Sequence, residues 1–295
     1  MLNLYRAELL KIVGNRWVTG FTLWIFPVGA LGAVLFVALL ALAVDDFAAQ
    51  FFREPPLWTS AMISAWNFPT NILGQMFLMG LTAVTFAGEY QWGTWKNIIP
   101  RRRRTALILI KFLALGTLVL FTFVLMSLIL GLGYGLIAQI GGVPYGPAIT
   151  RTTLAEFARD YSFQAFVTFL TVLITAIYAA FAAMLTRSIL GGVMVGLGIV
   201  VVEPISTFLL APVAFHFDWT FLLTIMRLTP TYNINNVTSW VTQNMPNPTI
   251  AFYYEAQGLP PPADSLGFSL LVLTGWVVLG IGLILWLFQR QDINS

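Results

Sequence analysis

Few side chains in this sequence have a type and spacing that could support chemistry. The 295 residues include no cysteine and one histidine, His216. Disulfides and thiolate metal sites are therefore excluded, and a histidine-rich metal cluster or a Ser-His-Asp triad has poor support. We predict no catalytic residue and no metal ligand, so the chain itself is not expected to be an enzyme. Because the G-x-x-x-x-G-K-[ST] motif is also missing, any use of nucleotide energy would need an ATPase on another chain.

One carboxylate lies deep inside an apolar run. Glu203 is roughly 21 Å along the helix expected over residues 189–214, at 1.5 Å per residue. A carboxylate near the middle of a bilayer costs on the order of 2.5–3.5 kcal/mol, so it should face a cavity, be paired or be protonated. Glu203 is thus a candidate substrate or proton site beside a helix loosened by Pro204. The favoured alternative is structural: a cap at a helix break, or a partner for Arg227.

Polar side chains also recur along the apolar run before residue 88. Asn71, Gln75 and Thr82 are spaced so that they lie on one side of a helix, and Thr85 follows them. This pattern fits the lining of a substrate path. It fits equally well hydrogen bonds between helices, which are worth about 0.6 kcal/mol each. Both interpretations remain open at this point.

The densest group of charges lies in "FAGEYQWGTWKNIIPRRRRTALILIKFL", Phe86 to Leu113. Five of the fifteen basic residues fall within this stretch between positions 96 and 104. Pro100 suits the first turn of a helix. Four arginines there oppose the helix dipole by roughly 0.3–1 kcal/mol each, and anionic lipid headgroups would offset this at about 1 kcal/mol per arginine.

The residues before Pro100 are too polar to cross a membrane and too aromatic for a flexible loop. We expect a short helix along the membrane surface, with Glu89 near its start, Lys96 near its end, and Trp92 and Trp95 on one face. Gly93 would allow a kink or a close backbone contact. Such a surface could dock a partner, or it could simply anchor two spans.

Composition sets the fold that must position these residues. Charged residues make up 9% of the chain and hydrophobic ones 58%, whereas soluble domains average about 25% charged. Apolar runs long enough to span a bilayer occur at residues 17–44, 69–88, 105–138, 161–185, 189–214 and 266–288. We predict an all-α membrane protein with six transmembrane helices, in one domain over residues 1–295. Residues 2–16 should form an interfacial amphipathic helix, and residues 216–265 a large outer loop containing short helices.

Basic residues indicate the orientation. With six spans, eleven basic side chains fall on the side of the termini and four on the other. The positive-inside tendency then places both termini in the cytoplasm of a multi-pass protein of a cell membrane, as in a prokaryotic inner or plasma membrane.

The stretch from Phe86 to Lys111 resembles the signature of type-2 permeases of ATP-binding-cassette (ABC) exporters. That family has an aromatic residue, then Glu, Gly-Thr, a Pro-Arg segment and a Lys in the next span. The N-terminal "LYRAELLKIVGNRW", the tail "LFQRQDINS" and the six-span layout resemble the family as well. Four consecutive arginines depart from its usual pattern, so contact of Arg102, Arg103 and Arg104 with lipid or with an ATPase stays open.

The resemblance implies an export permease that dimerises with a second copy or a paralogue and binds cytoplasmic ABC ATPases. ATP and Mg would be held by those ATPases, with no cofactor in this chain and no nucleic acid partner. The implied coupling residues are Glu89, Tyr90, Trp92, Gly93, Thr94, Trp95, Lys96 and Arg101. The apolar composition favours an amphipathic or hydrophobic substrate. The alternative function is a membrane scaffold or sensor that recruits a cytoplasmic signalling partner without transporting anything.

Overall fold

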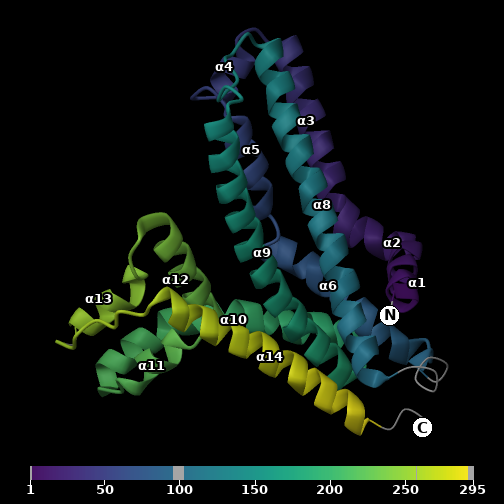
Figure 1. Cartoon of the computed structure of the whole chain (residues 1–295), viewed down its shortest axis with the longest axis vertical. Coiled ribbons are helices and arrows are strands. Elements are labelled where there is room, and N and C mark those ends of the chain that lie inside the picture. The colour runs from purple at the N-terminus through teal and green to yellow at the C-terminus, as the bar shows by residue number, and fades with distance from the viewer. Residues whose placement is uncertain (1, 96–102, 257, 292–295) are drawn as a thin grey trace. The chain divides into compact units, whose positions relative to one another are not determined.

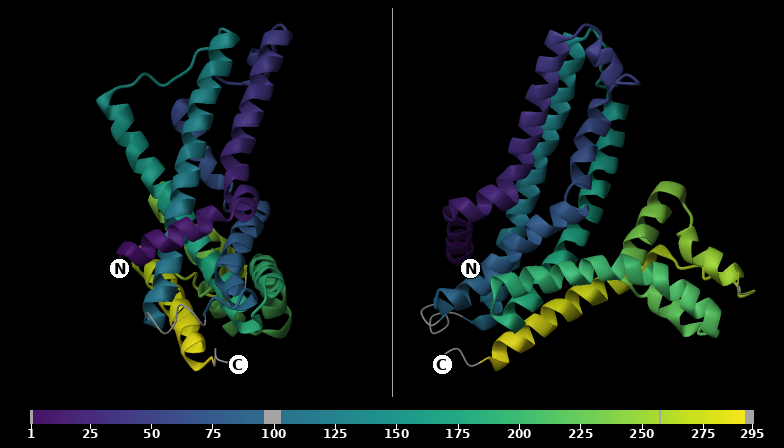
Figure 2. Two further views of the ribbon diagram at one scale, coloured as in Figure 1. Left: turned by 90° about the vertical axis from the view of Figure 1, so that its right-hand side faces the viewer. Right: turned by 180° about the vertical axis from the view of Figure 1, so that it is seen from behind.

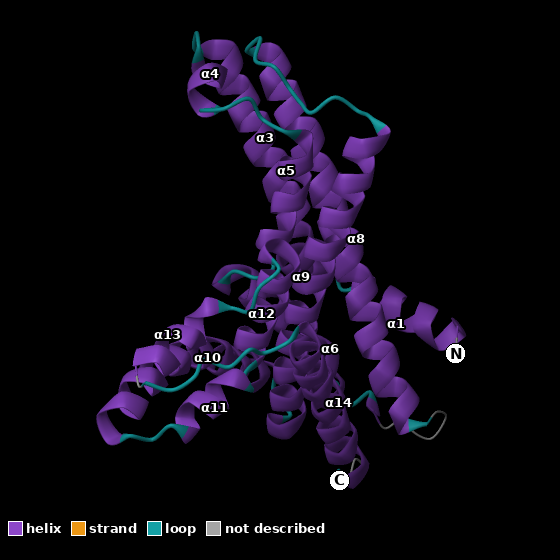
Figure 3. Cartoon of the chain, turned by 60° about the vertical axis from the view of Figure 1, so that its left-hand side comes forward, coloured by secondary structure: helices purple, strands orange, loops and turns teal. Residues whose placement is uncertain are grey.

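The computed structural model describes residues 2–95, 103–256 and 258–291. Every regular element within these ranges is a helix, apart from one isolated bridge between Leu57 and Gly146 (Figures 1 and 3). Six of the helices are long and apolar enough to cross a membrane. The chain is therefore an all-helical, multi-pass membrane protein.

All six predicted runs are helical. The first span comprises α2 (Arg16–Thr19), the π-helical η1 (Gly20–Trp24) and α3 (Ile25–Ala43). The others are α6 (Ile72–Gln91), α8 (Arg104–Ile140), α9 (Arg151–Thr186), α10 (Ile189–Phe217) and α14 (Leu266–Arg290). α9 begins well before the apolar run at Tyr161, because the Thr150 hydroxyl accepts the amide of Thr153 at 3.1 Å and starts the helix among polar residues.

The helix α10 runs without a break through Pro204 and Pro212. The sequence led us to expect a loosened or broken helix at Pro204, and the structure shows a continuous one. Each proline still removes one backbone donor from the helix. The hydroxyl of Ser206 donates to the carbonyl of Glu203 at 2.7 Å, which provides a local partner beside the first proline.

The chain forms two compact units. The first contains residues 1–85 and 101–172, and the second contains residues 86–100 and 173–295. In the first unit, α3 and α8 lie side by side (Figure 2). The ring of Phe123 in α8 is 5.0 Å from that of Phe26 in α3 and 6.0 Å from Trp66 in η2 (Ala65–Asn67). The short helices α4 (Phe47–Phe51) and α5 (Trp58–Ser64) also pack against α8.

The predicted N-terminal helix is present as α1 (Leu2–Gly14). Its Glu8 carboxylate lies 3.0 Å from the Lys111 ammonium of α8, and the Tyr5 hydroxyl donates to Thr117 at 2.8 Å. Leu2 and Leu10 are exposed on α1. One face of α1 is therefore attached to α8, while apolar side chains remain exposed as on an interfacial helix.

The expected short helices between residues 216 and 265 belong to the second unit. They are α11 (Phe221–Arg227), α12 (Pro230–Gln243) and α13 (Pro248–Ala256), which we call the cap. Buried Asp264 accepts Arg227 Nε at 2.9 Å and the Tyr232 hydroxyl at 2.8 Å. Burial, followed by the hydrogen bond to Asp264, raises the pKa of Tyr232. Asn236 is buried and donates to Asp264 O and Ser269 Oγ, so its "NVT" sequence does not present a glycosylation acceptor.

Candidate functional site

Residues 86–95, which we call the elbow, contain the last turns of α6 and the turn that ends it. The amide of Thr94 donates to Glu89 O at 3.0 Å and that of Gly93 to Tyr90 O at 3.2 Å, with Gly93 at φ +64°. This is a Schellman ending, in which a left-handed residue, usually glycine, satisfies the last carbonyls of a helix. The predicted start of the short helix near Glu89 is therefore wrong, and the remainder of its expected length, from Lys96 on, lies outside the described residues. Glu89 lies in the last turn of α6, since the sequence up to Gln91 contains nothing that stops a helix.

The two tryptophans of the elbow do not share a face. Trp92 is 56% exposed, whereas Trp95 is 1% exposed and packs at a tilt against Phe288 of α14, with ring centroids 4.6 Å apart. The turn at Gly93 separates them, so helical spacing does not apply. Trp92 covers Gly88, where an added Cβ would lie 2.8 Å from the indole ring. The elbow therefore presents one aromatic side chain outward and buries the other.

Polar contacts attach the elbow to the ends of two spans. The Tyr90 hydroxyl donates to the Gln291 side chain just after α14, and Gln291 Nε2 donates to Met184 O of α9 at 2.8 Å. The Thr94 hydroxyl donates to the Glu89 carboxylate, which is buried. Glu89, Tyr90 and Trp95 are thus internal parts of the elbow rather than surface residues.

The basic part of the motif is described only from Arg103 onward. Lys96, Arg101 and Arg102 lie outside the described residues, and α8 begins at Arg104. Lys111 does not lie on a charged surface: it is 1% exposed and bonds Glu8 at 3.0 Å and Thr85 O at 3.1 Å. Its charge is therefore matched inside the first unit.

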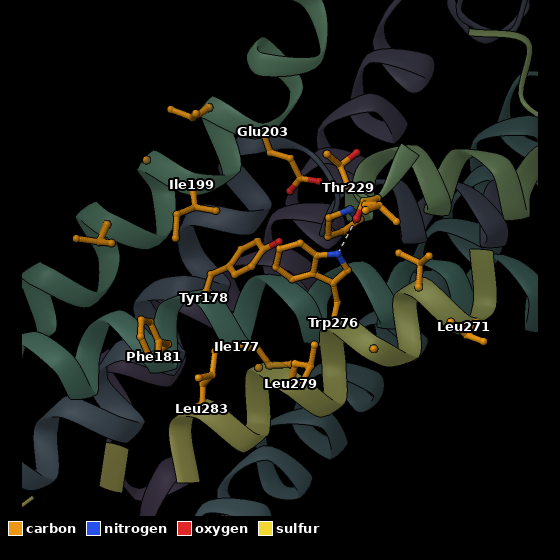
Figure 4. Close-up of a pocket in the computed structure, with 18 residues that line it drawn as sticks. Ile177, Tyr178, Phe181, Ile199, Glu203, Thr229, Leu271, Trp276, Leu279 and Leu283 are labelled. Carbon is orange, nitrogen blue, oxygen red and sulfur yellow. Dashed lines mark hydrogen bonds between the residues drawn. The ribbon is translucent and has the colours of Figure 1, made fainter. Parts of the chain in front are cut away.

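A large, open cavity lies in the second unit between α9, α10, α14 and the start of α12. Its volume is about 1020 Å³, and most of its lining is aliphatic or aromatic (Figure 4). The lining residues are Ile177, Tyr178, Phe181, Val195, Gly198, Ile199, Val202, Glu203, Leu228, Thr229, Pro230, Leu271, Val272, Gly275, Trp276, Leu279, Gly280 and Leu283.

Glu203 lies in the polar corner of this cavity. Its Oε1 accepts the backbone amide of Thr231 at 2.8 Å, in the first turn of α12. A carboxylate at a helix N-terminus is favoured by the helix dipole. The hydroxyl of Tyr178 points toward the Glu203 carboxylate (Figure 4). Glu203 therefore caps the N-terminus of a second helix, α12, and borders a cavity. The cap at a break in its own helix, which the structural interpretation expected, is not present, because α10 is continuous.

The other suggested partner of Glu203 is engaged elsewhere. Arg227 pairs with Asp264, and the hydrogen bond to that carboxylate raises the pKa of the guanidinium. On the far side of the corner, the indole of Trp276 donates to Leu228 O at 2.8 Å and meets the Tyr178 ring edge-on at 6.1 Å.

The polar residues of α6 are not part of this cavity. Asn71 accepts the amide of Gly74 at 2.8 Å at the start of α6, and the Thr82 and Thr85 hydroxyls donate to carbonyls one turn back in the same helix. Gln75 donates to Thr70 O at 2.7 Å, while its buried Oε1 has no hydrogen-bond partner among the described residues. Among the described residues, these side-chain bonds stay within α6 and the turn just before it, and none of them joins α6 to another helix.

Sequence reasoning missed Tyr178 and Trp276. Both are amphipathic aromatics inside apolar runs rather than at their ends, where the membrane interface favours such rings. Their place in the middle of an apolar run is the one feature of the sequence that could have identified them. It points to a shared site only once the structure shows that α9 and α14 meet there.

The comparison with models of known protein families gave no match, and neither did the comparison with curated proteins. The resemblance to type-2 ABC permeases therefore depends on the Phe86–Lys111 motif and the order of the spans. The fold itself defines a multi-pass, all-helical membrane protein.

Proposed function

We propose that this chain is the permease subunit of an ATP-driven exporter, powered by a separate cytoplasmic ATPase. The observation that carries the proposal is the attachment of the elbow to the helix that lines the cavity. Trp95 and Tyr90 contact Phe288 and Gln291 at one end of α14, and Trp276 and Leu279 of the same helix border the cavity. A force applied to the elbow would therefore act directly on a cavity wall.

The elbow has the properties that such a role requires. It is stiffened by the Schellman ending and by buried aromatic packing, and it exposes Gln91, Trp92 and Gly93. Exposed aromatic residues are the residue type that most often dominates protein interfaces. In this proposal those three residues bind the ATPase, and Glu89, Tyr90 and Trp95 keep the elbow rigid. The chain works as a dimer, with a second copy or a paralogue supplying the other half of the transporter.

The test combines partner capture with transport. When the chain is isolated in mild detergent together with its native partners, an ATPase should be recovered with it. Trp92→Ala should reduce ATPase capture and ATP-driven transport at least tenfold while leaving membrane insertion unchanged, because Trp92 contributes little to the internal packing. Gly93→Trp should abolish transport, since the left-handed backbone there strains any other residue.

Trp219→Ala is the matched control, because this exposed tryptophan lies in the turn before α11, away from the elbow in the chain. It should leave capture and transport unchanged. Normal transport in both elbow variants would contradict the proposal. Capture of a partner that hydrolyses no nucleotide would instead support the scaffold or sensor function.

A further inference from the structure

The cavity of the second unit has the chemistry of a binding site for one class of molecule. We propose that it binds a single-chain amphiphile whose head carries a net positive charge, such as a quaternary ammonium, and no phosphate. The head would lie at Glu203, Tyr178 and Trp276, and the tail would lie between α10 and α14. Binding itself is independent of the proposed transport, whereas treating this molecule as the exported cargo rests on the proposed function.

Charge and aromaticity identify the head. Glu203 supplies a carboxylate at the cavity wall, where it accepts the Thr231 amide and the Tyr178 hydroxyl points toward it. The rings of Tyr178 and Trp276 border the same corner (Figure 4). A cation close to aromatic faces is favoured by roughly 0.5–2 kcal/mol, and desolvation strengthens this attraction.

The lining also argues against a phospholipid head. The described lining residues include one carboxylate and no lysine, arginine or histidine. A phosphate beside the ammonium would meet the Glu203 charge without a compensating cation, and like charges are strongly disfavoured where water is scarce. A net cation is therefore preferred over a zwitterion.

The remaining lining suits a slender apolar tail. From Trp276 to Leu283 the wall extends about 10 Å along α14, at 1.5 Å per residue, and is entirely apolar. The volume of about 1020 Å³ is at the upper end of the usual range for small-molecule sites, roughly 300–1,000 Å³. Gly198 and Gly275 contribute to this space, since a Cβ added at either would meet nothing within 4 Å.

The experiment measures saturable binding of radiolabelled dodecyltrimethylammonium to the purified chain in phosphatidylcholine nanodiscs, with empty nanodiscs as background. No ATPase is present, so a failure here is separate from a failure of the transport proposal. Dodecanol and dodecylphosphocholine serve as neutral and zwitterionic competitors with the same tail. Both should compete at least tenfold more weakly than the unlabelled cation. Equal competition by all three would overturn the assignment of a cationic head.

Two pairs of variants locate the site. Glu203→Gln keeps an acceptor for the Thr231 amide and should weaken binding of the cation about tenfold, while Glu255→Gln, an exposed carboxylate of α13, should not change it. Gly275→Leu should remove saturable binding by filling the cavity. Gly282→Leu on the same helix should leave saturable binding unchanged. A Cβ added at Gly282 also meets nothing within 4 Å, but Gly282 does not line the cavity. Unchanged affinity in Glu203→Gln with normal size-exclusion behaviour would overturn the proposal, even if Gly275→Leu failed to fold.

Discussion

At the scale of single residues, the buried pair formed by Lys111 and Glu8 has a direct consequence for stability. Both side chains are buried, and the two charged groups lie 3.0 Å apart. Removing one partner of a buried pair leaves an uncompensated charge and typically costs about 3–5 kcal/mol, whereas replacing both by apolar residues is often close to neutral.

We therefore expect Lys111→Met to destabilise the protein by about 3–5 kcal/mol and the double variant Glu8→Leu/Lys111→Met to lose much less. The measurement is the apparent melting temperature in detergent, monitored as the loss of the monodisperse size-exclusion peak on heating. Arg159→Gln, which breaks an exposed pair with Asp160, is the control and should change it little. Equal losses in the single and double variants would show that the charges are not coupled.

The surroundings of Glu203 could be predicted from the sequence only in part. Its position in an apolar run was sufficient to predict a partner or a cavity, because an isolated carboxylate in a membrane is costly. The identity of the partner could not be predicted. The Thr231 donor is a backbone amide, which every residue except proline carries, so no sequence pattern distinguishes it.

At the scale of helices, length and hydropathy were sufficient to predict all six spans, since a bilayer fixes how many apolar residues a helix needs. Helix ends were harder. The elbow contains good helix formers up to Gln91, and Gly93 alone did not reveal whether the helix would kink or end. Likewise, the meeting of Tyr178 and Trp276 depends on the tertiary register between α9 and α14, which hydropathy does not contain.

The packing of α3 on α8 gives a prediction at the same scale. A Cβ at Gly133 would lie 2.5 Å from two methyl groups of Val34, so Gly133→Val should force the helices apart and cost about 1–3 kcal/mol. The control is Gly32→Val on α3, where an added Cβ meets nothing within 4 Å. Apparent melting temperatures of the two variants provide the measurement. Equal stability of the two would contradict close packing at Gly133.

At the scale of the whole molecule, the distribution of charge predicts that the elbow faces the cytoplasm and the cap faces outward. The natural absence of cysteine makes this easy to test with single-cysteine variants and a membrane-impermeant maleimide. Thr242→Cys and Glu255→Cys in the cap should be labelled in intact cells. Gln91→Cys in the elbow should be labelled only after permeabilisation. Labelling of Gln91→Cys from outside would reverse the orientation and remove the elbow from reach of any cytosolic ATPase.

The attachment of α14 at both of its ends has a mechanical consequence. Phe288 and the adjoining Gln291 fix one end to the elbow, while Ser269 at the other end accepts a hydrogen bond from Asn236 of the cap. A helix of 25 residues spans about 37 Å and transmits load along its axis with little compression. The cavity lies halfway along α14, so a ligand bound there should slow amide hydrogen exchange at both ends of this helix together. A ligand that slows exchange at only one end of α14 would be bound outside the cavity.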